Sequence, residues 1–566
     1  MHQPDTTPRK SIFFDYRIHP FSKPADFDAP ARQRVIIIGA GPVGLVTALY
    51  LARMGVPCVL ATADVQVSEG SRALAFTRRS MEILQQVGAA EHVVRHGLPW
   101  QYGNSYYRGR RVFRLEIPYA EDDAFAPLTN LQQQLLEEHL VELIDAEPLV
   151  DLRWGTRFEG LEQDDDGVTV TLDTPAGPYR MAADWLVATD GAKSSVRQSM
   201  KLRMEGDSYE GRFVIVDVRV DLGLPTERLA FFDPDWNPGN TILMHRQPHG
   251  LWRFDYQVPA EESSEAALSP DSIRARVNAQ LAMIGHAGKT WEMDWASIYS
   301  ARAMTLPRYR YGRVLFAGDA AHMLPIFGVR GLNTGWQDAQ NLAWKLALVA
   351  KGRAAPALLD SYSAERVAAA REIIDEASKS ARFMTPPTHG FRLLRDATLS
   401  LSLSQAFVRP LLHWRTSRPH EYTRSPLNTA ADEESFAEGP RPGATAPNVR
   451  LDSGGYLLDR LGPAFHLLCF CQDGRVPAVL AAEAAGLARD GIPVSVTALA
   501  RAEAPLPAEA IDDRSQRAHR LYGADGRDAV YLLRPDQHVA ARWRRPPSGA
   551  LTRAVRHMLE CEEVPS

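Results

Sequence analysis

Cysteine is scarce in this chain. Four cysteines are spread over 566 residues: Cys58, Cys469, Cys471 and Cys561. So few cysteines in a chain of this length argue against a disulfide framework and indicate a reducing compartment, so a cytoplasmic protein is expected. Cysteines and histidines nowhere share the spacing of a zinc site, and the sequence therefore predicts no metal centre.

Long apolar runs and concentrated positive charge are also missing. No stretch of about 18 apolar residues occurs, and the polar segment Met1–Gln33 has no apolar signal core, so neither a membrane span nor an export signal is expected. The formal net charge is −5 and no basic run is present, which argues against a nucleic-acid partner. The length suits about three domains.

The chain does contain a glycine-rich turn between a strand and a helix. Val35–Ile38 is a run of β-branched residues, typical of a buried parallel strand, and it leads into a G-x-G-x-x-G pattern. Glycines in this pattern allow a tight turn, a close approach to a pyrophosphate and close helix packing. Val56–Ala61 restores a strand and completes the β-α-β unit. A dinucleotide is therefore predicted to bind at Gly39, Gly41, Pro42, Val43 and Gly44.

The acidic residue that usually ends the second strand of such a unit is missing. That residue accepts hydrogen bonds from the ribose hydroxyls. Here Thr62 stands at its position, and Asp64 follows two residues later. Either Asp64 reaches the ribose or Thr62 does so with a neutral hydroxyl, and the sequence leaves both alternatives open.

Two further segments combine a strand with a polar turn. The strand that begins at Trp185 leads into Asp190-Gly191, and Gly318-Asp319 lies between a strand and a glycine-punctuated loop that starts a helix. Together with the first motif, this order resembles the class A flavoprotein monooxygenases, the family of para-hydroxybenzoate hydroxylase. The overall layout is more similar to the phenol and 3-(3-hydroxyphenyl)propionate hydroxylases, which carry an extra C-terminal domain.

The resemblance implies an α/β fold: a Rossmann-type FAD-binding domain with an inserted, mostly antiparallel β-sheet domain for the substrate, plus a C-terminal thioredoxin-like α/β domain. Period-two alternation in 213–220, 241–246 and 252–258 suits the inserted sheet. The expected division is an N-terminal extension 1–32, an FAD-binding domain 33–205 and 301–400, a substrate sheet 206–300, a linker 401–447 and a thioredoxin-like domain 448–566.

Redox chemistry in the C-terminal domain is not expected. Strands are predicted at 464–470, 493–498 and 529–533. Cys469-Phe470-Cys471 is a C-x-C sequence on the first of them, and a C-x-x-C helix start is absent. This domain is interpreted as structural or dimer-forming.

The resemblance also implies roles around the cofactor. Asp319 would contact the ribityl chain of FAD, and Asp190 with Gly191 would lie where FAD and the reductant both approach. Arg72 would give the pyrophosphate a bidentate, permanently charged contact. Gln133 would touch the cofactor as well. The alternatives are a surface arginine at position 72 and an ordinary helix-face amide at position 133.

The helix predicted to start near Leu332-Asn333 would direct its free N–H groups and positive dipole end at the flavin. Gly331 belongs to the same predicted contact. Arg330 would add a full charge that stabilises reduced flavin, although a solvated loop charge is an equal alternative. His322 looks catalytic, yet it is interpreted as a structural neighbour of the cofactor loop.

Substrate contacts are harder to assign. Pro325-Ile326-Phe327 replaces the Pro-Pro pair common in the family, which indicates a more apolar wall beside the reacting ring and a substrate unlike para-hydroxybenzoate. Three residues of the predicted sheet are candidates for the pocket: His245, Arg253 and Tyr256. His245 and Tyr256 are also named, with Arg330, as catalytic candidates. Each of the three sheet residues is better explained as an ordinary sheet residue than as a substrate ligand, and no general base is assigned.

The resemblance implies an FAD-dependent aromatic hydroxylase. NADPH or NADH would serve as transient reductant, O2 would form a flavin hydroperoxide, and a phenol- or catechol-type ring would attack it. A nitro or halogen group on the attacked carbon would be lost. The cofactor carries the chemistry, while the protein supplies position, charge and exclusion of water. A small aromatic substrate and a homodimer are expected.

Other flavoprotein classes are weighed against this interpretation. A flavin-dependent halogenase needs a W-x-W-x-I-P segment and a catalytic lysine, and Trp252–Pro259 reads WRFDYQVP without the paired tryptophans. An FAD-dependent oxidase or reductase that makes no oxygenated product stays open. So does a non-enzymatic flavin redox sensor whose C-terminal domain binds a partner. The three motifs favour hydroxylation.

Overall fold

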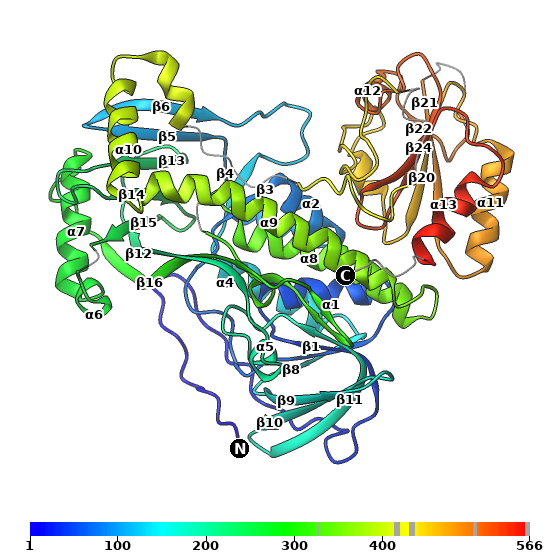
Figure 1. The fold of residues 1–566 in the computed structure, drawn as a ribbon, viewed down its shortest axis with the longest axis horizontal. Coiled ribbons are helices and arrows are strands. Elements are labelled where there is room, and N and C mark those ends of the chain that lie inside the picture. The colour runs from blue at the N-terminus through cyan, green and yellow to red at the C-terminus, as the bar shows by residue number, and fades with distance from the viewer. Residues whose placement is uncertain (260, 326–327, 413–418, 430–435, 502–505, 561–566) are drawn as a thin grey trace.

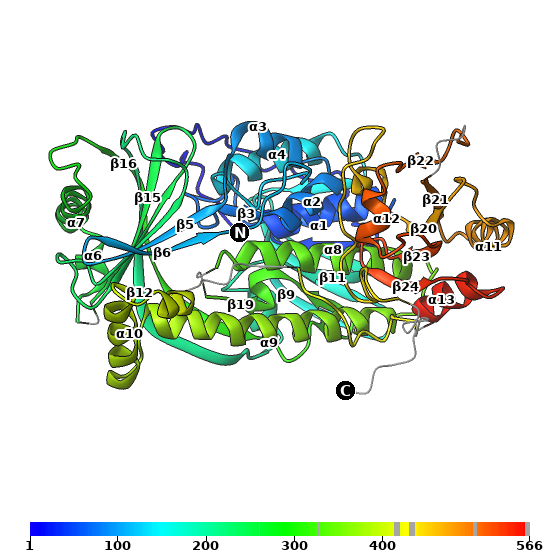
Figure 2. The same ribbon diagram turned by 90° about the horizontal axis from the view of Figure 1, so that it is seen from above.

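The computed structural model describes residues 1–259, 261–325, 328–412, 419–429, 436–501 and 506–560. In the described part of the chain, three larger sheets, one small sheet and their helices make up the molecule (Figure 1). Seen from above, a large antiparallel sheet lies at one end, the C-terminal sheet at the other, and the glycine-rich turn belongs to the body between them (Figure 2).

The first sheet carries the glycine-rich turn. Its strands are β1 (Gln33–Ile38), β2 (Cys58–Ala61), β8 (Val150–Arg153), β9 (Arg157–Gln163), β10 (Val168–Thr174), β11 (Gly177–Ala188), β17 (Arg310–Tyr311) and β18 (Val314–Phe316). The main order is β17-β18-β11-β1-β2-β8, and the pairs from β18 to β8 are parallel. Val35–Ile38 is buried, as a β-branched run inside a parallel sheet predicts.

Helices cover this sheet and position its turns. They are α1 (Pro42–Arg53), α2 (Arg78–Gln86), α3 (Ala90–His96), α4 (Gln133–Asp145), α5 (Ser195–Ser199), η1 (Gly318–Ala320), α8 (Gly331–Ala350) and α9 (Leu358–Met384). Helix α1 packs against α4 and α8, and α8 packs against α9. Every residue of α8 from Asn333 to Val349 is buried, so this helix runs through the centre of the body. A small sheet of β3 (Ala75–Thr77), β7 (Leu128–Asn130) and β4 (Leu98–Trp100) lies beside it.

The second sheet is the inserted one. Its strands, in spatial order, are β19 (His322–Met323), β16 (Glu292–Thr305), β12 (Glu205–Arg219), β15 (Leu251–Val258), β14 (Thr241–Arg246), β13 (Arg228–Phe232), β5 (Tyr102–Tyr107) and β6 (Arg110–Glu116). All neighbours are antiparallel except β13 and β5. Helices α6 (Ser264–Ala267) and α7 (Pro270–Met283) pack on one face, against Val214, Phe254 and their neighbours.

This sheet is larger than the predicted range 206–300. The hairpin of β5 and β6 comes from the preceding part of the chain and joins through β13, where Gly103 pairs with Arg228. Strand β12 starts at Glu205 and β16 ends at Thr305. A pairing between strands more than 100 residues apart has no local signature, so the sequence pattern assigned the hairpin to the first domain.

The third sheet forms the C-terminal part. It has the order β22-β21-β20-β23-β24, with β20 (Phe465–Cys471), β21 (Val494–Ala500), β22 (Ile511–Asp512), β23 (Ala529–Leu533) and β24 (Val539–Trp543). Its helices are η4 (Leu457–Arg460), α11 (Ala478–Arg489), α12 (Arg517–Leu521) and α13 (Ala550–Leu559). The three strands predicted here are confirmed within two residues. Burial raises the pKa of the Cys469 thiol to about 12, which keeps it protonated and unreactive.

Buried charges fix the third sheet to the body. Glu365 in α9 accepts hydrogen bonds from Arg534 Nη1 and Lys345 Nζ, each at 2.6 Å. Asp536 also binds Arg534 and accepts from Trp344 Nε1 at 3.1 Å. Burial alone would raise the pKa of Glu365, but Arg534 and Lys345 outweigh it and lower this pKa. The loop after β23 is therefore part of the interior.

The first 32 residues run along the body without a helix or strand. Arg9 N donates to Gln66 Oε1 at 3.0 Å, next to the end of β2. Further on, Ser11 Oγ and Ile12 N donate to Asp294 of β16 at 2.6 and 2.8 Å. This segment therefore connects the first and second sheets. Among the described residues, no helix combines the length and apolarity needed to cross a membrane.

Two further segments complete the chain between the sheets. Helix α10 (His389–Ser402) and η2 (Ala406–Leu412) follow α9. The end of α9 packs on the second sheet, where Met384 joins Phe213, Leu243 and Leu399 in one cluster. In the predicted linker, the described residues Tyr422 and Leu427 are buried.

Candidate active site

The glycine-rich turn has the backbone that its function needs. Gly39 has φ +108°, and a Cβ there would lie 2.6 Å from the carbonyl oxygen of Thr189. A Cβ at Gly44 would lie 1.9 Å from the Gly39 oxygen, so neither glycine can be replaced without movement. Gly41 differs, because nothing lies within 4 Å of its Cβ position and α1 starts at the next residue. The space at Gly41 is open to an anion at a helix N-terminus.

Pro42 and Val43 join the first motif to the third. The Trp336 indole donates to the Pro42 oxygen at 3.1 Å. Val43 Cγ2 would lie 3.0 Å from a Cβ at Gly318 and 2.7 Å from one at Gly335. The Gly318-Asp319 turn thus lies beside the glycine-rich turn, although nearly 280 residues separate them in sequence.

The two candidates for the ribose contact occupy different surroundings. Thr62 is buried at the end of β2, where its N–H donates to the Arg153 oxygen at 3.0 Å. The Asp64 side chain is 64% exposed and lies 3.5 Å from Arg9 Nη2 of the N-terminal segment. Thr62 therefore holds the position of the missing acid, and a ribose contact by either residue stays a prediction.

Loop 68–73 carries Arg72 and is supported by Gln133. The Gln133 side chain accepts from Ala73 N at 3.0 Å and donates to Glu137 at 2.6 Å. Its backbone N–H donates to Ser71 Oγ at 3.0 Å. Both ends of the Gln133 amide thus have protein partners, and its predicted contact with the cofactor stays a prediction. Arg72 itself is exposed.

Arg72 and Asp319 face the same space. Asp319 is an exposed residue. The protein around it removes water from its carboxyl and so raises the pKa, while His322 and Arg72 act to lower this pKa. Arg197 stands nearby and donates to the Ala320 oxygen at 2.9 Å. The space between Gly41, Arg72 and Asp319 is referred to below as the cofactor recess.

Asp190 and Gly191 follow β11 in the middle motif. Asp190 Oδ2 accepts from Ser195 Oγ at 3.0 Å and from Val196 N at 3.1 Å. Its Oδ1 is buried and has no hydrogen-bond partner within the described part of the chain. Gly191 has φ +76° and nothing within 4 Å of its Cβ position. One carboxylate oxygen and one open backbone face are available to a ligand here.

Helix α8 begins beside these turns. Its first internal hydrogen bond runs from Thr334 N to the Arg330 oxygen, so the N–H groups of Gly331, Leu332 and Asn333 have no partner inside the helix. The Asn333 side chain accepts from Thr77 N and donates to the Ala75 oxygen, both at 2.9 Å. A fixed, positive helix end results.

Arg330 is buried, with 2% exposure, and lies 3.6 Å from Glu376 of α9. The alternative interpretation as a solvated loop charge is therefore wrong. Because Glu376 balances the charge, the field of Arg330 at a flavin would be weaker than that of a lone cation. A catalytic role of Arg330 stays a prediction. The preceding Val329 has φ +55°, a strained conformation for a β-branched residue.

His322 supports the Gly318 turn through a carboxylate. His322 is fully buried, and its Nε2 lies 2.6 Å from Asp338 Oδ2. The same oxygen accepts from Gly318 N at 3.0 Å, and Oδ1 accepts from Arg366 Nε at 2.6 Å. Burial alone would raise the pKa of Asp338, but His322 and Arg366 lower it. These contacts position the turn rather than reach a substrate.

Arg253 ties the second sheet to the Arg72 loop. Its guanidinium donates to Asp217 at 2.8 and 2.9 Å, to the Ser71 oxygen, and to the Arg72 oxygen at 3.4 Å. Burial alone would lower the pKa of Arg253, but Asp217 raises it. Arg253 is therefore a positioning residue between the two sheets.

Tyr256 lies on the wrong face for a pocket residue. Its ring packs 6.0 Å from Trp236, and Arg276 of α7 lies over it at 5.4 Å. Successive residues of a strand point to opposite faces, so Arg253 and Asp255 face the first sheet and Tyr256 faces α7. The prediction that Tyr256 lines the substrate pocket is wrong, because the alternation does not reveal which face is covered.

His245 lies on the same face as Arg253, its partner in the β14–β15 pair. It is 7% exposed, and its Nδ1 has no hydrogen-bond partner among the residues that the structure describes. Burial, with Arg228 and Arg253, lowers its pKa well below the usual value. A neutral imidazole can donate or accept a hydrogen bond here, but it has no charge with which to attract a substrate.

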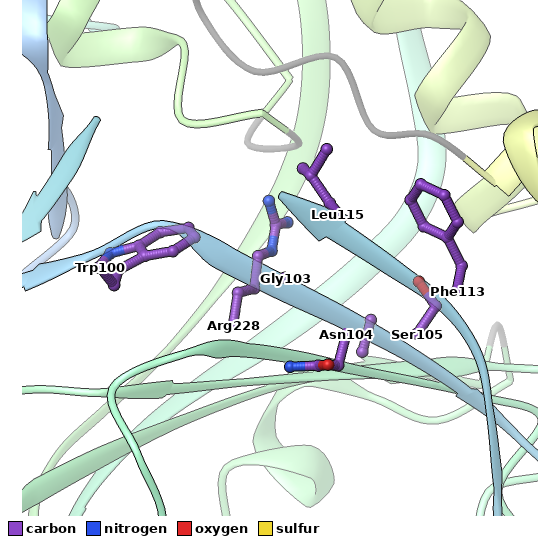
Figure 3. Close-up of a pocket in the computed structure, with 8 residues that line it drawn as sticks. Trp100, Gly103, Asn104, Ser105, Phe113, Leu115 and Arg228 are labelled. Atoms are coloured by element: carbon purple, nitrogen blue, oxygen red, sulfur yellow. The ribbon is translucent and has the colours of Figure 1, made fainter. Parts of the chain in front are cut away.

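A small cavity lies farther along the same face (Figure 3). Its volume is about 10 Å³, room for about one water molecule. The lining residues are Trp100, Gly103, Asn104, Ser105, Phe113, Leu115, Arg228 and Ala230. Arg228 is the charged residue among them, and Figure 3 shows its guanidinium between Trp100 and Leu115.

The cavity adjoins the start of α8. Trp100 belongs to a cluster with Ala75 and Leu128, against which Val329 packs. Pro325 is buried, whereas Ile326 and Phe327 lie outside the described residues, so the predicted apolar wall is untested. Within the described ranges, no group of three His, Cys, Asp or Glu side chains is placed to hold a metal ion.

Sequence reasoning missed four residues of this face: Trp100, Asp217, Arg228 and Asp255. Asp255 could have been found, because it follows Arg253 by two positions in an alternating strand. Arg228 gives no comparable signal, since its neighbours in β13 are all apolar and only the pairing with β5 brings it to the cavity.

The recess fits FAD. It offers an open helix N-terminus at Gly41 and an exposed cation at Arg72, both suited to a pyrophosphate. Asp319 can accept hydrogen bonds from a polyol, and the free N–H groups of α8 suit the electron-rich edge of a flavin. FAD supplies hydride acceptance and oxygen activation when bound. These features define a flavin-binding enzyme.

Comparisons with known proteins agree. A family model described as an FAD binding domain matches residues 32–377. The 3-(3-hydroxy-phenyl)propionate/3-hydroxycinnamic acid hydroxylase of Mycolicibacterium smegmatis is 30% identical over 457 residues, 79% of each chain. The flavin-dependent monooxygenase PieE, solved with FAD and substrate, matches with a TM-score of 0.77 and 25% identity over 94% of this chain and 100% of that one. Aklavinone-11 hydroxylase with FAD and aklavinone gives 0.73 and 25% over 93% and 99%.

The chain belongs to this FAD-binding family of flavin monooxygenases and is an FAD-dependent aromatic hydroxylase.

Proposed function

We propose that this enzyme hydroxylates a small phenol with an acidic side chain, consuming NADPH or NADH and O2. The buried cation Arg228 on the substrate-side face carries the proposal, since a positive charge near apolar and aromatic side chains suits an aromatic acid. The name of the Mycolicibacterium relative, a hydroxylase of two hydroxyphenyl acids, supports it. FAD in the recess would lie next to this face, because Arg253 joins the face to the Arg72 loop.

The roles of the chain's own residues follow from their positions. Arg72 and the N-terminus of α1 would hold the pyrophosphate, and Asp319 the ribityl chain. The free N–H groups of α8 would stabilise negative charge on the flavin. Trp100 and the neutral His245, whose rings lie 6.4 Å apart, would border the aromatic ring and exclude water.

A second candidate substrate is a larger polycyclic phenol. The similarity to aklavinone-11 hydroxylase over 93% of this chain favours it, whereas the name of the Mycolicibacterium relative favours a single ring. A nitro- or halophenol, with loss of the ring substituent, is a third possibility that the same chemistry would allow.

One panel assay separates these candidates. The FAD-loaded enzyme is mixed with NADPH or NADH and with hydroxyphenyl acids, simple phenols, nitrophenols and a polycyclic phenol. NAD(P)H oxidation, product mass, nitrite and hydrogen peroxide are recorded together. We expect an oxygenated product from a hydroxyphenyl acid. Oxidation that yields only peroxide with every compound would overturn the proposed substrate class.

We also propose that the C-terminal part, about residues 448–566, is a thioredoxin-like domain with a structural role. Its sheet supports this, with β20 parallel to β21 and antiparallel to β23. The buried, protonated Cys469 argues against thiol chemistry. The free thiols of Cys58, Cys469 and Cys471 support a reducing, cytoplasmic location.

A homodimer is the proposed assembly. Six large apolar side chains on α10 and η2 are 39–77% exposed, namely Phe391, Leu393, Leu394, Leu401, Phe407 and Leu411. Apolar surface of this extent usually marks an interface. Sedimentation of the wild type and of Leu394→Glu tests it: a dimer that the substitution dissociates is expected, and a monomeric wild type would contradict the proposal.

A further inference from the structure

The loop between β2 and β3, residues 62–74, joins two predicted contacts of FAD. Thr62 and Asp64 at its start are the candidates for the ribose contact, and Arg72 near its end is the candidate for the pyrophosphate contact. The loop contains no helix or strand, so no regular series of backbone hydrogen bonds fixes it from within. A loop of this length that carries ligand contacts needs support from other parts of the chain.

The N-terminal segment supports the first half of this loop. Arg9 N donates to Gln66 Oε1 at 3.0 Å, and Gln66 Nε2 donates back to the Thr7 oxygen at 3.0 Å. The Arg9 guanidinium donates to the Val67 oxygen and lies 3.5 Å from Asp64 Oδ1. Gln66 is 4% exposed, so these contacts belong to the interior. Arg9 thus contacts both the backbone of the loop and the acidic candidate for the ribose.

Tyr16 holds the second half of the same loop. It is 7% exposed, and its hydroxyl accepts from Gly70 N at 2.9 Å and donates to the Ser68 oxygen at 3.3 Å. Gly70 has φ +63° and packs against Trp295 of β16, because a Cβ at this position would lie 2.3 Å from the indole. The Tyr16 hydroxyl therefore fixes the turn that ends two residues before Arg72.

Between these two points the N-terminal segment is bound to the second sheet. Ser11 Oγ and Ile12 N donate to Asp294 of β16, and Arg219 of β12 donates to the Ile12 oxygen at 2.5 Å. In Figure 1 the blue trace runs from the N-terminus to β16. Residues 2–19 are called the N-terminal strap below. The strap connects the 62–74 loop to the second sheet.

The strap lies outside the part of the chain that the family model matches, which is residues 32–377. The 62–74 loop lies inside that part. The hydrogen bonds from Arg9 and Tyr16 are therefore additions to a cofactor site whose other elements the family model already includes.

We propose that the strap holds the 62–74 loop in the conformation that receives the adenosine half of FAD, with Arg9 and Tyr16 as positioning residues. A loop that is ordered before the ligand arrives loses little conformational freedom when the ligand binds. Arg9 also offsets the charge of Asp64, so the loop presents less negative charge to a diphosphate. The inference rests on the predicted ribose and pyrophosphate contacts and is independent of the substrate class.

FMN separates support of the adenosine half from general support of the fold, because FMN has the flavin and one phosphate but no adenosine. Fluorescence titration of the apoprotein measures the affinities for FAD and for FMN. We expect Tyr16→Phe and Arg9→Met each to weaken FAD binding about tenfold and FMN binding less than about twofold. Equal losses for FAD and FMN, or no loss for FAD, would overturn the proposal.

Two variants serve as matched controls. Tyr119→Phe changes a tyrosine that is 49% exposed. Lys23→Met removes a cation of the N-terminal segment beyond the strap, where Lys23 pairs with Asp28 at the surface. Both should bind FAD as the wild type does. If Arg72→Met weakens FAD binding whereas Tyr16→Phe and Arg9→Met do not, the contact of Arg72 stands and the role of the strap is overturned.

Hydrogen exchange measures the order of the loop directly and does not depend on FMN binding. The Ser68 amide is the reporter, because it donates to Glu137 at 2.7 Å and not to the strap. In the wild type it should be protected with and without FAD. In Tyr16→Phe it should exchange at least about tenfold faster without FAD and be protected again when FAD binds, while β1 exchanges as in the wild type. A Ser68 amide that exchanges equally in the two apoproteins would overturn the proposal.

Discussion

Arg253 of β15 donates a hydrogen bond to the backbone oxygen of Ser71, in the loop that carries Arg72. The same guanidinium holds Asp217 of β12 at 2.8 Å. A residue of the second sheet thus fixes the loop that carries Arg72, the predicted pyrophosphate contact. Arg253 therefore links the cofactor recess to this face of the second sheet.

Removal of Arg253 should affect both stability and cofactor binding. Arg253→Met leaves the buried Asp217 without its cation, and we expect a loss of about 3–5 kcal/mol in the free energy of unfolding, with weaker FAD binding. The double variant Arg253→Met/Asp217→Asn should lose less, because no unpaired buried charge is left. Urea unfolding and FAD titration measure both effects. Arg180→Met, which breaks an exposed pair with Glu162, is the control and should change stability by about 0.5 kcal/mol or less.

Alanine at Gly44 should prevent folding, whereas alanine at Gly41 should weaken FAD binding. Gly44→Ala meets the Gly39 oxygen at 1.9 Å, so we expect little folded protein. Gly41→Ala meets no protein atom within 4 Å, so the apoprotein should melt as the wild type does. Its added methyl group lies where a pyrophosphate would approach, and FAD affinity should fall at least about tenfold, or about 1.4 kcal/mol. Unchanged FAD affinity in Gly41→Ala would show that the pyrophosphate lies elsewhere.

Arg72 should act on the cofactor and hardly at all on the fold. Its side chain is exposed, so Arg72→Met should leave the melting temperature of the apoprotein unchanged. Loss of a charged contact with phosphate should weaken FAD binding by about 1.5–3 kcal/mol and reduce its dependence on salt. Fluorescence titration at two salt concentrations measures this. Arg489→Met, at an exposed position of α11, should bind FAD normally, and equal behaviour of the two variants would refute the contact.

Asp255 should make the fold less stable as pH rises. Its pKa is about 7 in the folded protein against an ordinary 3.8, so between these values the folded state holds a proton that the unfolded state has released. Its contribution is fully present below about pH 4 and is lost as pH rises through about 7, at up to about 1.4 kcal/mol per pH unit. Asp255→Asn should remove this decline, and Asp235→Asn should retain it. Urea unfolding from pH 4 to 8 tests the difference; parallel curves for wild type and Asp255→Asn would contradict it.

Local patterns predicted much of this molecule. The β-branched run of β1 is a strong signal because that strand is buried on both faces. The polar and apolar alternation predicted strands at β14 and β15, although both faces of these strands are buried. The three glycine motifs indicated where a cofactor binds, because close approach of backbone to ligand restricts the residue type.

The sequence did not predict which distant strands pair or which face of a strand a helix covers. The hairpin of β5 and β6 joins the second sheet through β13, a pairing that no neighbouring residue encodes. Tyr256 and Asp255 are adjacent in one alternating strand, and nothing in the strand itself says which of them α7 covers. Arg330 is polar and precedes a glycine, features of an exposed loop, yet it is buried and Glu376 from a distant helix balances its charge.

Glu365 also limits how this chain can be recombined with its relatives. Lys345, Arg534 and Ser425 all bind its carboxylate, and they come from α8, the C-terminal loop and the segment between them. A chimera that takes its last hundred residues from a protein without an equivalent of Arg534 would leave Glu365 with too little positive charge inside the body. The C-terminal part is therefore inherited together with α8 and α9, as one exchangeable unit rather than a detachable module.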